Sequence, residues 1–367
     1  MKIVTVVGAR PQFIKAATLS RAIANHNSKP GYVAIEEKIV HTGQHYDKNM
    51  SDSFFNQLGI PQPDLNLGAG GGTQAEQTAA IMIGYEKLLM VKKSDLCLVV
   101  GDVTSTMACS IVAQKAHIPV AHVEAGIRSG DWSMPEEINR LITDSITNYF
   151  FTTTQEAGNN LKKIGIADER IHWVGNTMID TLLKHYTKFQ KPEIWDQLNL
   201  SKNRYIVMTL HRPSNVDEEK KFKSLINEII MNSQNLPLIF PVHPRTGKIL
   251  DSLRLDHEHL HAINPLGYLE FNYLVKNAKA VITDSGGITE ETTVMGIPCM
   301  TLRNNTERPE TVKLGTNILL GTNPKAIKPA MEKLFSGKWK KGSIPEKWDG
   351  KTAERIVSIL TKMKNLD

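Results

Sequence analysis

Four acidic residues lie close together in one segment of a chain that is basic overall. Glu124, Asp131, Glu136 and Glu137 fall within fourteen positions, whereas the 367-residue chain has a formal net charge of +6. Carboxylates that are held close together raise one another's pKa, so that one of them can accept and return a proton near neutral pH. Acid–base chemistry is therefore one use for this segment.

Ionisable residues also follow seven of the runs that we expect to be strands. These stretches are Gly8–Pro11, Gly101–Asp102, Glu124–Gly126, His211–Pro213, His243–Arg245, Asp284–Gly287 and Arg303. In open α/β sheets, ligands bind outside the carboxyl ends of the strands. The pattern predicts a single cleft between two domains, lined by residues from both sheets.

The Ser285-Gly286-Gly287 turn leads into a predicted helix, Ile288–Met295. Free N–H groups and the positive end of the helix dipole form an anion site there, and the glycines let an anion approach the backbone. The turn is therefore typical of a phosphate-binding site.

Charged residues complete this candidate phosphate site. Arg10 and Lys15, at the start of the first predicted helix, can supply cations from the other domain. Of Glu290 and Glu291, one suits the helix dipole and the other a ribose diol, which it would bind through both carboxylate oxygens.

The elements that position these residues alternate between β-branched runs and helix-length amphipathic segments. The expected strands are Lys2–Val7, Ile39–His41, Leu96–Val100, Val120–Val123, Tyr149–Thr152, Tyr205–Leu210, Leu238–Val242, Ala280–Thr283 and Pro298–Leu302. Most of them suit burial on both faces, which predicts an α/β fold with parallel sheets covered by helices on both sides. The length predicts two domains, and a polar stretch at 184–203 separates two series of strands. We place the join near Asn176, which gives domains of residues 1–175 and 176–351.

Several classes of partner are not expected. The lysines and arginines are scattered apart from Lys338–Lys341, so the basic balance indicates a phosphorylated small molecule and no nucleic acid. His41, His45 and His122 with Asp47 lack metal-site spacing, and no metal is expected.

The cellular setting follows from apolar runs and cysteines. No apolar run approaches the roughly 20 residues that span a bilayer, so no membrane association is expected. Cys97, Cys109 and Cys299 lie in apolar surroundings, which predicts buried thiols and a cytoplasmic protein.

Eight ordered motifs closely resemble those of the non-hydrolysing UDP-N-acetylglucosamine 2-epimerases. They are GARPQFIK (8–15), TGQHYD (42–47), GDVTST (101–106), HVEAGIRS (122–129), PEEINR (135–140), HRPSNV (211–216), DSGGITEE (284–291) and TERPE (306–310). The resemblance implies two Rossmann-like domains in the glycosyltransferase type B fold, with a final helix at 352–367 that packs back on the first domain. It also implies a UDP-sugar substrate, no cofactor, and a homodimer.

The family is understood to eliminate UDP, which leaves a 2-acetamidoglycal, and then to add UDP back with the opposite configuration at carbon 2. This route needs a base on one face of the sugar, an acid on the other, and groups that stabilise the departing diphosphate. It would interconvert UDP-N-acetylglucosamine and UDP-N-acetylmannosamine, precursors of surface polysaccharides.

The resemblance assigns roles residue by residue. Asp102, Glu124 and Glu136 match the catalytic acids, with the roles of base and acid left open, and His211 matches a catalytic histidine. The residues expected to bind the UDP-sugar are Arg10, Lys15, Phe271, Ser285, Gly286, Gly287, Glu291 and Arg308. Among these, Phe271 would pack on uracil, Glu291 would hold the ribose, and Arg308 would lie near the sugar and phosphate. Glu137 and Asp131 are expected to be structural, paired with Arg140 or Arg128.

One departure from the family bears on substrate and regulation. Many bacterial members bind a second substrate molecule as activator through a Gln-His-x-Gln segment and an arginine, but this chain has Gln44–Asp47 and an arginine-free loop at Gly68–Gly72. Both features also resemble relatives that act on UDP-2,3-diacetamido-2,3-dideoxy-glucuronate, which stays an alternative substrate. Three further alternatives are a glycosyltransferase of the same fold, a hydrolysing epimerase and a non-catalytic sugar-nucleotide sensor.

Overall fold

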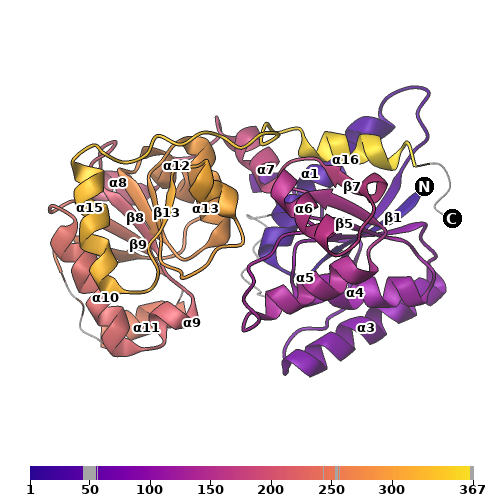
Figure 1. The fold of residues 1–367 in the computed structure, drawn as a ribbon, viewed down its shortest axis with the longest axis horizontal. Coiled ribbons are helices and arrows are strands. Elements are labelled where there is room, and N and C mark those ends of the chain that lie inside the picture. Colours follow the sequence, from indigo (N-terminus) through magenta and orange to yellow (C-terminus); the bar gives the residue numbers. More distant parts are fainter. Residues whose placement is uncertain (44–54, 56, 243, 253–254, 256, 364–367) are drawn as a thin grey trace. The chain divides into compact units, whose positions relative to one another are not determined.

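The chain forms two α/β units, each built on one sheet (Figure 1). The computed structural model describes residues 1–43, 55, 57–242, 244–252, 255 and 257–363. The first unit comprises Met1–Lys184 and Glu346–Asp367, and the second comprises His185–Pro345. No helix within these described ranges has the length and apolar character needed to cross a membrane.

The first unit contains a parallel sheet of strand order β3-β2-β1-β4-β5-β6-β7. Its strands are β1 (Lys2–Val7), β2 (Glu36–His41), β3 (Leu65–Asn66), β4 (Leu96–Val100), β5 (Val120–Val123), β6 (Tyr149–Thr152) and β7 (Ile171–Trp173). Its helices are α1 (Arg10–Asn27), α3 (Gln74–Val91), α4 (Thr104–Lys115), α5 (Pro135–Ile146), α6 (Gln155–Lys163), α7 (Thr177–His185) and α16 (Thr352–Leu360).

Alternate residues of these strands enter two different apolar cores. In β4, Leu96 and Leu98 pack in a core that includes α1 and α16, while Cys97 and Val99 pack in one that includes α3 and α4. Both faces are buried, and β4 accordingly has no polar alternation in its sequence.

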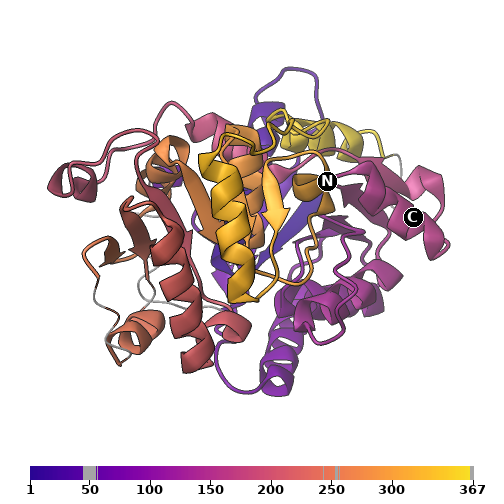
Figure 2. The ribbon, with the colours of Figure 1, turned by 60° about the vertical axis from the view of Figure 1, so that its left-hand side comes forward.

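The second unit contains a parallel sheet of strand order β10-β9-β8-β11-β12-β13. Its strands are β8 (Ile206–Thr209), β9 (Leu238–Pro241), β10 (Leu260–Ile263), β11 (Ala280–Thr283), β12 (Cys299–Thr301) and β13 (Asn317–Leu319). Its helices are α8 (Glu193–Gln197), α9 (Pro213–Val216), α10 (Glu219–Asn232), α11 (Pro244–Ser252), α12 (Tyr268–Asn277), α13 (Gly286–Met295), α14 (Pro309–Lys313) and α15 (Ile327–Phe335). One face packs against α10 and α15, which lie side by side (Figure 2), and the other packs against α12 and α13.

The final helix belongs to the first unit. Helix α16 lies beside α1 (Figure 1), and its amino end is held by the buried carboxylate of Asp180, which accepts from the N–H groups of Thr352 (3.1 Å) and Ala353 (2.8 Å). Because Asp180 lies on α7, these hydrogen bonds connect α7 with α16 in the first unit. The division between the units falls between Lys184 and His185, at the last residue of α7, whereas the sequence places the join near Asn176, before that helix.

The structure contains four strands that the sequence did not indicate: β3, β7, β10 and β13. All four have two to four residues, and all four are edge strands. Strands β3 and β7 are the edges of the first sheet, and β10 and β13 are the edges of the second. Edge strands are partly exposed, so they lack the long apolar run by which the interior strands are recognised.

Candidate active site

Two of the predicted acids lie at the carboxyl edge of the first sheet. Asp102 lies two residues beyond β4 and Glu124 directly follows β5, and Val100 at the end of β4 pairs with Val123 at the end of β5. The strand order reverses between β1 and β4, which is where doubly wound sheets bind ligands. The structure therefore brings Asp102 and Glu124 to one edge, beside this reversal.

The chain turns tightly at Glu124. This residue has φ +72°, a conformation that costs a non-glycine residue about 1–3 kcal/mol. Gly126 follows with φ +77°, and a Cβ there would lie 2.2 Å from the carbonyl oxygen of Ala157. Only glycine fits this position, and the turn fixes the direction in which Glu124 leaves the sheet.

Glu124 is buried against a cation. Lys15 Nζ lies 2.7 Å from its carboxylate, and both side chains are almost fully buried. The sequence assigned Lys15 to a phosphate; in the structure it also supplies the counter-charge of a predicted catalytic acid.

Asp102 is held by an arginine from α5. Arg140 donates to Asp102 Oδ2 from Nε (2.9 Å) and Nη2 (2.5 Å), and its Nη1 donates to Glu137 (2.6 Å). Glu137 also accepts from the N–H groups of Ser129 and Gly130. The predicted pairing of Glu137 with Arg140 is confirmed, whereas Asp131 accepts from Ser133 within its own turn.

Glu136 lies in the first turn of α5. It precedes Arg140 by four residues, so both side chains lie on the same helix face. Unlike Asp102 and Glu124, the half-buried Glu136 has no hydrogen bond or ion pair with any described residue. Among the described residues, its carboxylate is the one of the three that makes no ion pair with a cation.

Asp144 joins the turns that carry these acids. Its buried carboxylate contacts His122 Nδ1 (2.8 Å), Arg128 Nη1 (2.6 Å) and Gly126 N (3.1 Å), and His122 Nε2 contacts the carbonyl oxygen of Gly101 (2.8 Å). Burial alone would raise the pKa of Asp144, but His122 and Arg128 lower it below its usual value. Both ring nitrogens of His122 therefore have partners within the protein. No metal-type cluster occurs among the described residues, and His45 and Asp47 lie outside them.

His211 in the second unit is oriented by Asp284. The imidazole Nδ1 lies 2.8 Å from Asp284 Oδ1, and the backbone N–H groups of His211 and Arg212 donate to the same carboxylate. Burial raises the pKa of Asp284, but the hydrogen bond and charge of His211 outweigh it and lower the pKa overall. His211 follows β8 and Asp284 follows β11, so the pair lies where the strand order of this sheet reverses.

Helix α13 begins at Gly286, two residues before the predicted start at Ile288, so both glycines lie in its first turn. Its N-cap Ser285 makes no capping hydrogen bond through its side chain, and Ser285, Gly286 and Gly287 are partly exposed. The first N–H groups of the helix are therefore accessible to an anion.

Glu291 is a buried acid one turn further along α13. Its carboxylate accepts from Tyr268 Oη at 2.9 Å, and burial, only partly opposed by the hydrogen bonds of Tyr268 and Asn272, raises its pKa to about 7. Its neighbour Glu290 pairs with Arg308 Nε at 2.7 Å.

The remaining predicted binding residues differ in exposure. Arg10 is exposed at the start of α1, whereas Phe271 is half-buried on α12, against the core that contains Leu274 and Val275. Arg308 is buried. Within the second unit, Ser285, Gly286 and Gly287 lie together at the start of α13, and within the first unit Lys15 lies against Glu124.

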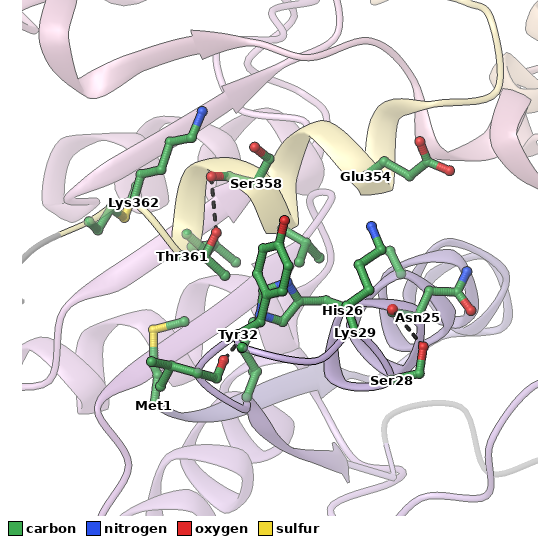
Figure 3. Close-up of a pocket in the computed structure, with 17 residues that line it drawn as sticks. Met1, Asn25, His26, Ser28, Lys29, Tyr32, Glu354, Ser358, Thr361 and Lys362 are labelled. Atoms are coloured by element: carbon green, nitrogen blue, oxygen red, sulfur yellow. Dashed lines mark hydrogen bonds between the residues drawn. The ribbon is translucent and has the colours of Figure 1, made fainter.

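A hollow of about 1110 Å³ in the first unit lies elsewhere (Figure 3). It is lined by the end of α1, by Met1 before β1, and by α16, with the Tyr32 ring packed edge-on against His26. Because Met1 precedes β1 whereas the acids follow their strands, the hollow lies at the amino edge of the sheet. It is not part of the predicted site.

Comparisons with known proteins agree with this arrangement. A family model described as UDP-N-acetylglucosamine 2-epimerase matches residues 31–361. The chain belongs to the UDP-N-acetylglucosamine 2-epimerase family. A Methanococcus maripaludis protein named UDP-N-acetylglucosamine 2-epimerase homolog is 47% identical, covering 89% of this chain and 90% of that protein.

Two further relatives of this epimerase family extend the comparison. The crystal structure of the Methanocaldococcus jannaschii UDP-GlcNAc 2-epimerase in complex with UDP-GlcNAc and UDP is 42% identical, with a TM-score of 0.86 over 98% of this chain and 99% of that one. The UDP-2,3-diacetamido-2,3-dideoxy-D-glucuronate 2-epimerase of Pseudomonas aeruginosa is 41% identical over 88% of each chain. The predicted family and its fold of two Rossmann-like domains, glycosyltransferase type B, are confirmed.

Several residues that support the site of this epimerase family member were missed from the sequence. They are Asp144, which lies among other polar residues of α5, and Gln12, which lies inside the GARPQFIK motif; neither position by itself indicates which residue it contacts in the fold. Gln12 accepts from Gly8 N (2.5 Å) and donates to the carbonyl oxygen of Val100 (2.5 Å), and so joins the ends of β1 and β4. The segment Gln44–Asp47, which the sequence linked to activation by substrate, lies outside the described residues.

We expect Asp144→Asn to lower the free energy of unfolding by about 3–5 kcal/mol at pH 7, because Arg128 loses its buried counter-charge. The folded-state pKa of Asp144 is depressed, so its contribution is complete above the unfolded pKa and is lost only as pH falls through the folded value. Urea unfolding at pH 7 measures the difference. Asp168→Asn, which breaks an exposed pair with Lys162, is the control; equal effects of the two substitutions would contradict the role of Asp144.

Proposed function

We propose that this chain is a non-hydrolysing 2-epimerase that interconverts UDP-N-acetylglucosamine and UDP-N-acetylmannosamine. The observation that carries the proposal is the set of acids at the carboxyl edge of the first sheet, in a member of the UDP-N-acetylglucosamine 2-epimerase family. Relatives named as this epimerase include the Methanocaldococcus jannaschii enzyme, whose structure holds UDP-GlcNAc and UDP.

The proposed reaction is an elimination followed by re-addition. A base removes the proton from carbon 2, the bond from carbon 1 to the UDP oxygen breaks, and its electron pair leaves with UDP to give a 2-acetamidoglycal. An acid then protonates carbon 2 from the opposite face while UDP adds back at carbon 1. Because C2 exchanges its proton with the protein's acids, solvent hydrogen enters the product.

We assign the proton transfers to Asp102, Glu124 and Glu136. The pairing of the half-buried Asp102 with Arg140 and of the buried Glu124 with Lys15 supports both carboxylates remaining charged. Within the described part of the chain Glu136 has no such ion pair, which suits a group that changes its protonation during the reaction.

We assign the nucleotide to the second unit. The amino end of α13 and His211, oriented by Asp284, suit the departing diphosphate, and Glu291 and Phe271 suit the ribose and uracil. Arg10, Lys15 and Arg308 are proposed to contact the diphosphate or the sugar.

A second substrate is favoured by one comparison. The Pseudomonas aeruginosa relative, 41% identical, acts on a diacetamido uronate according to its name. We therefore propose UDP-2,3-diacetamido-2,3-dideoxy-glucuronate as the alternative substrate of the same reaction.

Proton NMR in deuterated water tests both candidates. We expect UDP-N-acetylglucosamine to give the manno epimer with deuterium at carbon 2, because the proton passes through the protein's acids. Exchange with the uronate alone would overturn the first substrate in favour of the second. UDP release without a manno product would indicate a glycosyltransferase, free N-acetylmannosamine a hydrolysing epimerase, and tight binding without turnover a sensor.

The substitution Glu136→Gln tests the acid–base role of Glu136 in the same assay. We expect it to lower kcat by roughly 100- to 10,000-fold, as the loss of an acid–base group does, while the thermal unfolding midpoint stays unchanged because Glu136 holds no other described residue. Glu169→Gln, at an exposed position, is the matched control and should keep full activity. A Glu136→Gln variant with wild-type kcat would remove Glu136 from the mechanism.

Uridine binding should strengthen with rising pH. A carboxylate can accept from both ribose hydroxyls, whereas the protonated acid cannot, and burial raises the pKa of Glu291 to about 7. Between pH 6 and 8 we expect the Kd of uridine to fall by about tenfold, with the change lost in Glu291→Gln. Calorimetry measures it, and uridine has no phosphate whose titration would confuse the result. A pH-dependence that persists in Glu291→Gln would assign it to another group.

We propose a homodimer formed through α3 and α5 of the first unit. Helix α4 packs between α3 and α5. Exposed apolar side chains occur on both outer helices: Ile83 (54%) and Met90 (80%) on α3, and Ile138 (40%) on α5. Light scattering should give twice the chain mass, and Ile83→Glu should give a monomer because a charge would be buried at the interface. Met231→Glu, on an exposed apolar residue of α10, should leave the dimer intact; a monomeric wild type would end this proposal.

We also propose that the enzyme is cytoplasmic. All three cysteines are free and buried, as predicted, and free thiols are typical of a reducing compartment.

A further inference from the structure

A buried arginine that the assignments above do not use lies beside the amino end of α13. Arg303 lies just after β12 and is only 4% exposed. Its Nη2 donates to Glu307 Oε2 at 2.5 Å, and Asn305 Oδ1 lies 3.4 Å from the same nitrogen.

The other terminal nitrogen of Arg303 is buried without an acceptor. Nη1 has no hydrogen-bond partner within the part of the chain that the structure describes. It lies 3.9 Å from the point that a Cβ on Gly286 would occupy, and Glu307 Oε1 lies 2.7 Å from the same point, so the Arg303–Glu307 pair adjoins the first residue of α13. Leaving a buried donor unsatisfied costs about 1–3 kcal/mol, more when it is charged, which indicates that an acceptor outside the described residues completes the site.

Glu307 fixes the guanidinium in this orientation. Although burial alone would raise the pKa of Glu307, the hydrogen bond and charge of Arg303 and the charge of Arg308 lower it to about 2. The carboxylate therefore stays charged at neutral pH and holds Nη2. Because a guanidinium is planar and rigid, fixing Nη2 also fixes the direction of Nη1.

We propose that Arg303 binds the diphosphate of the UDP-sugar, with Nη1 donating to the anion at the amino end of α13 and Glu307 acting as its positioning residue. This inference rests on the proposed function and deepens it. As the bond from carbon 1 to the UDP oxygen breaks, the electron pair that UDP takes away adds negative charge to the diphosphate. A fixed guanidinium next to the helix N–H groups stabilises that charge.

Calorimetric titration with UDP and with uridine tests the proposal. We expect Arg303→Gln to raise the Kd of UDP by roughly 10- to 100-fold, the loss of a charged hydrogen bond, and to leave the Kd of uridine unchanged because uridine has no phosphate. The double variant Arg303→Gln/Glu307→Gln should show the same loss of UDP affinity and the same Kd of uridine. Because it removes both charges of the pair, it leaves no unpaired buried charge that could unfold the protein. Arg204→Gln, an exposed arginine of the same unit, is the control and should bind both ligands as the wild type does.

The outcomes separate this inference from the proposed function. Wild-type UDP affinity in the folded double variant would overturn the inference alone, as would a parallel loss of uridine affinity, which would make Arg303 structural. A wild-type chain that binds no UDP would overturn both the inference and the nucleotide site. A wild-type chain that binds UDP but exchanges no deuterium would overturn only the proposed reaction, and the Arg303 result would stand.

Discussion

The parallel direction of the strands is the constraint on which the rest of this structure depends. In each sheet every strand ends at the same edge, and the strand order reverses once, between β1 and β4 and between β8 and β11. The crossover helices on either side of such a reversal leave on opposite faces, so the loops there part and leave room for a ligand. Residues far apart in the chain, such as Asp102 and Glu124 or His211 and Asp284, meet at this edge because the strands that precede them are neighbours.

Burial then decides how these residues are held. A charged group removed from water is costly unless it is paired, and three of the four catalytic candidates have a buried partner of opposite charge. Arg140 holds Asp102, Lys15 holds Glu124, and Asp284 holds His211. These pairs serve two purposes, because each satisfies a buried charge and also fixes the direction of a side chain that chemistry would use.

The interior strands were predictable because burial on both faces leaves a local mark. The runs at Leu96–Val100 and Ala280–Thr283 appear in the structure with the predicted bounds, since a strand covered by helices on both sides has no polar face. The edge strands β3 and β13 have two and three residues and are partly exposed, and they carry no such mark. Likewise the glycine turn before α13 could be recognised, because the helix start and the approach of an anion both need small residues.

The sequence by itself determined the class of fold, the family, and the residue types available for acid–base and phosphate chemistry, because these depend on local patterns and ordered motifs. Only the tertiary structure decided the partners of those residues: that Lys15 neutralises Glu124, that Asp144 and His122 join the turns after β4 and β5, and that Arg303 lies beside Gly286. Each of these contacts joins residues on different elements. The physical reason is that a buried polar side chain must find its partner in space, and the distance along the chain places almost no limit on where that partner lies.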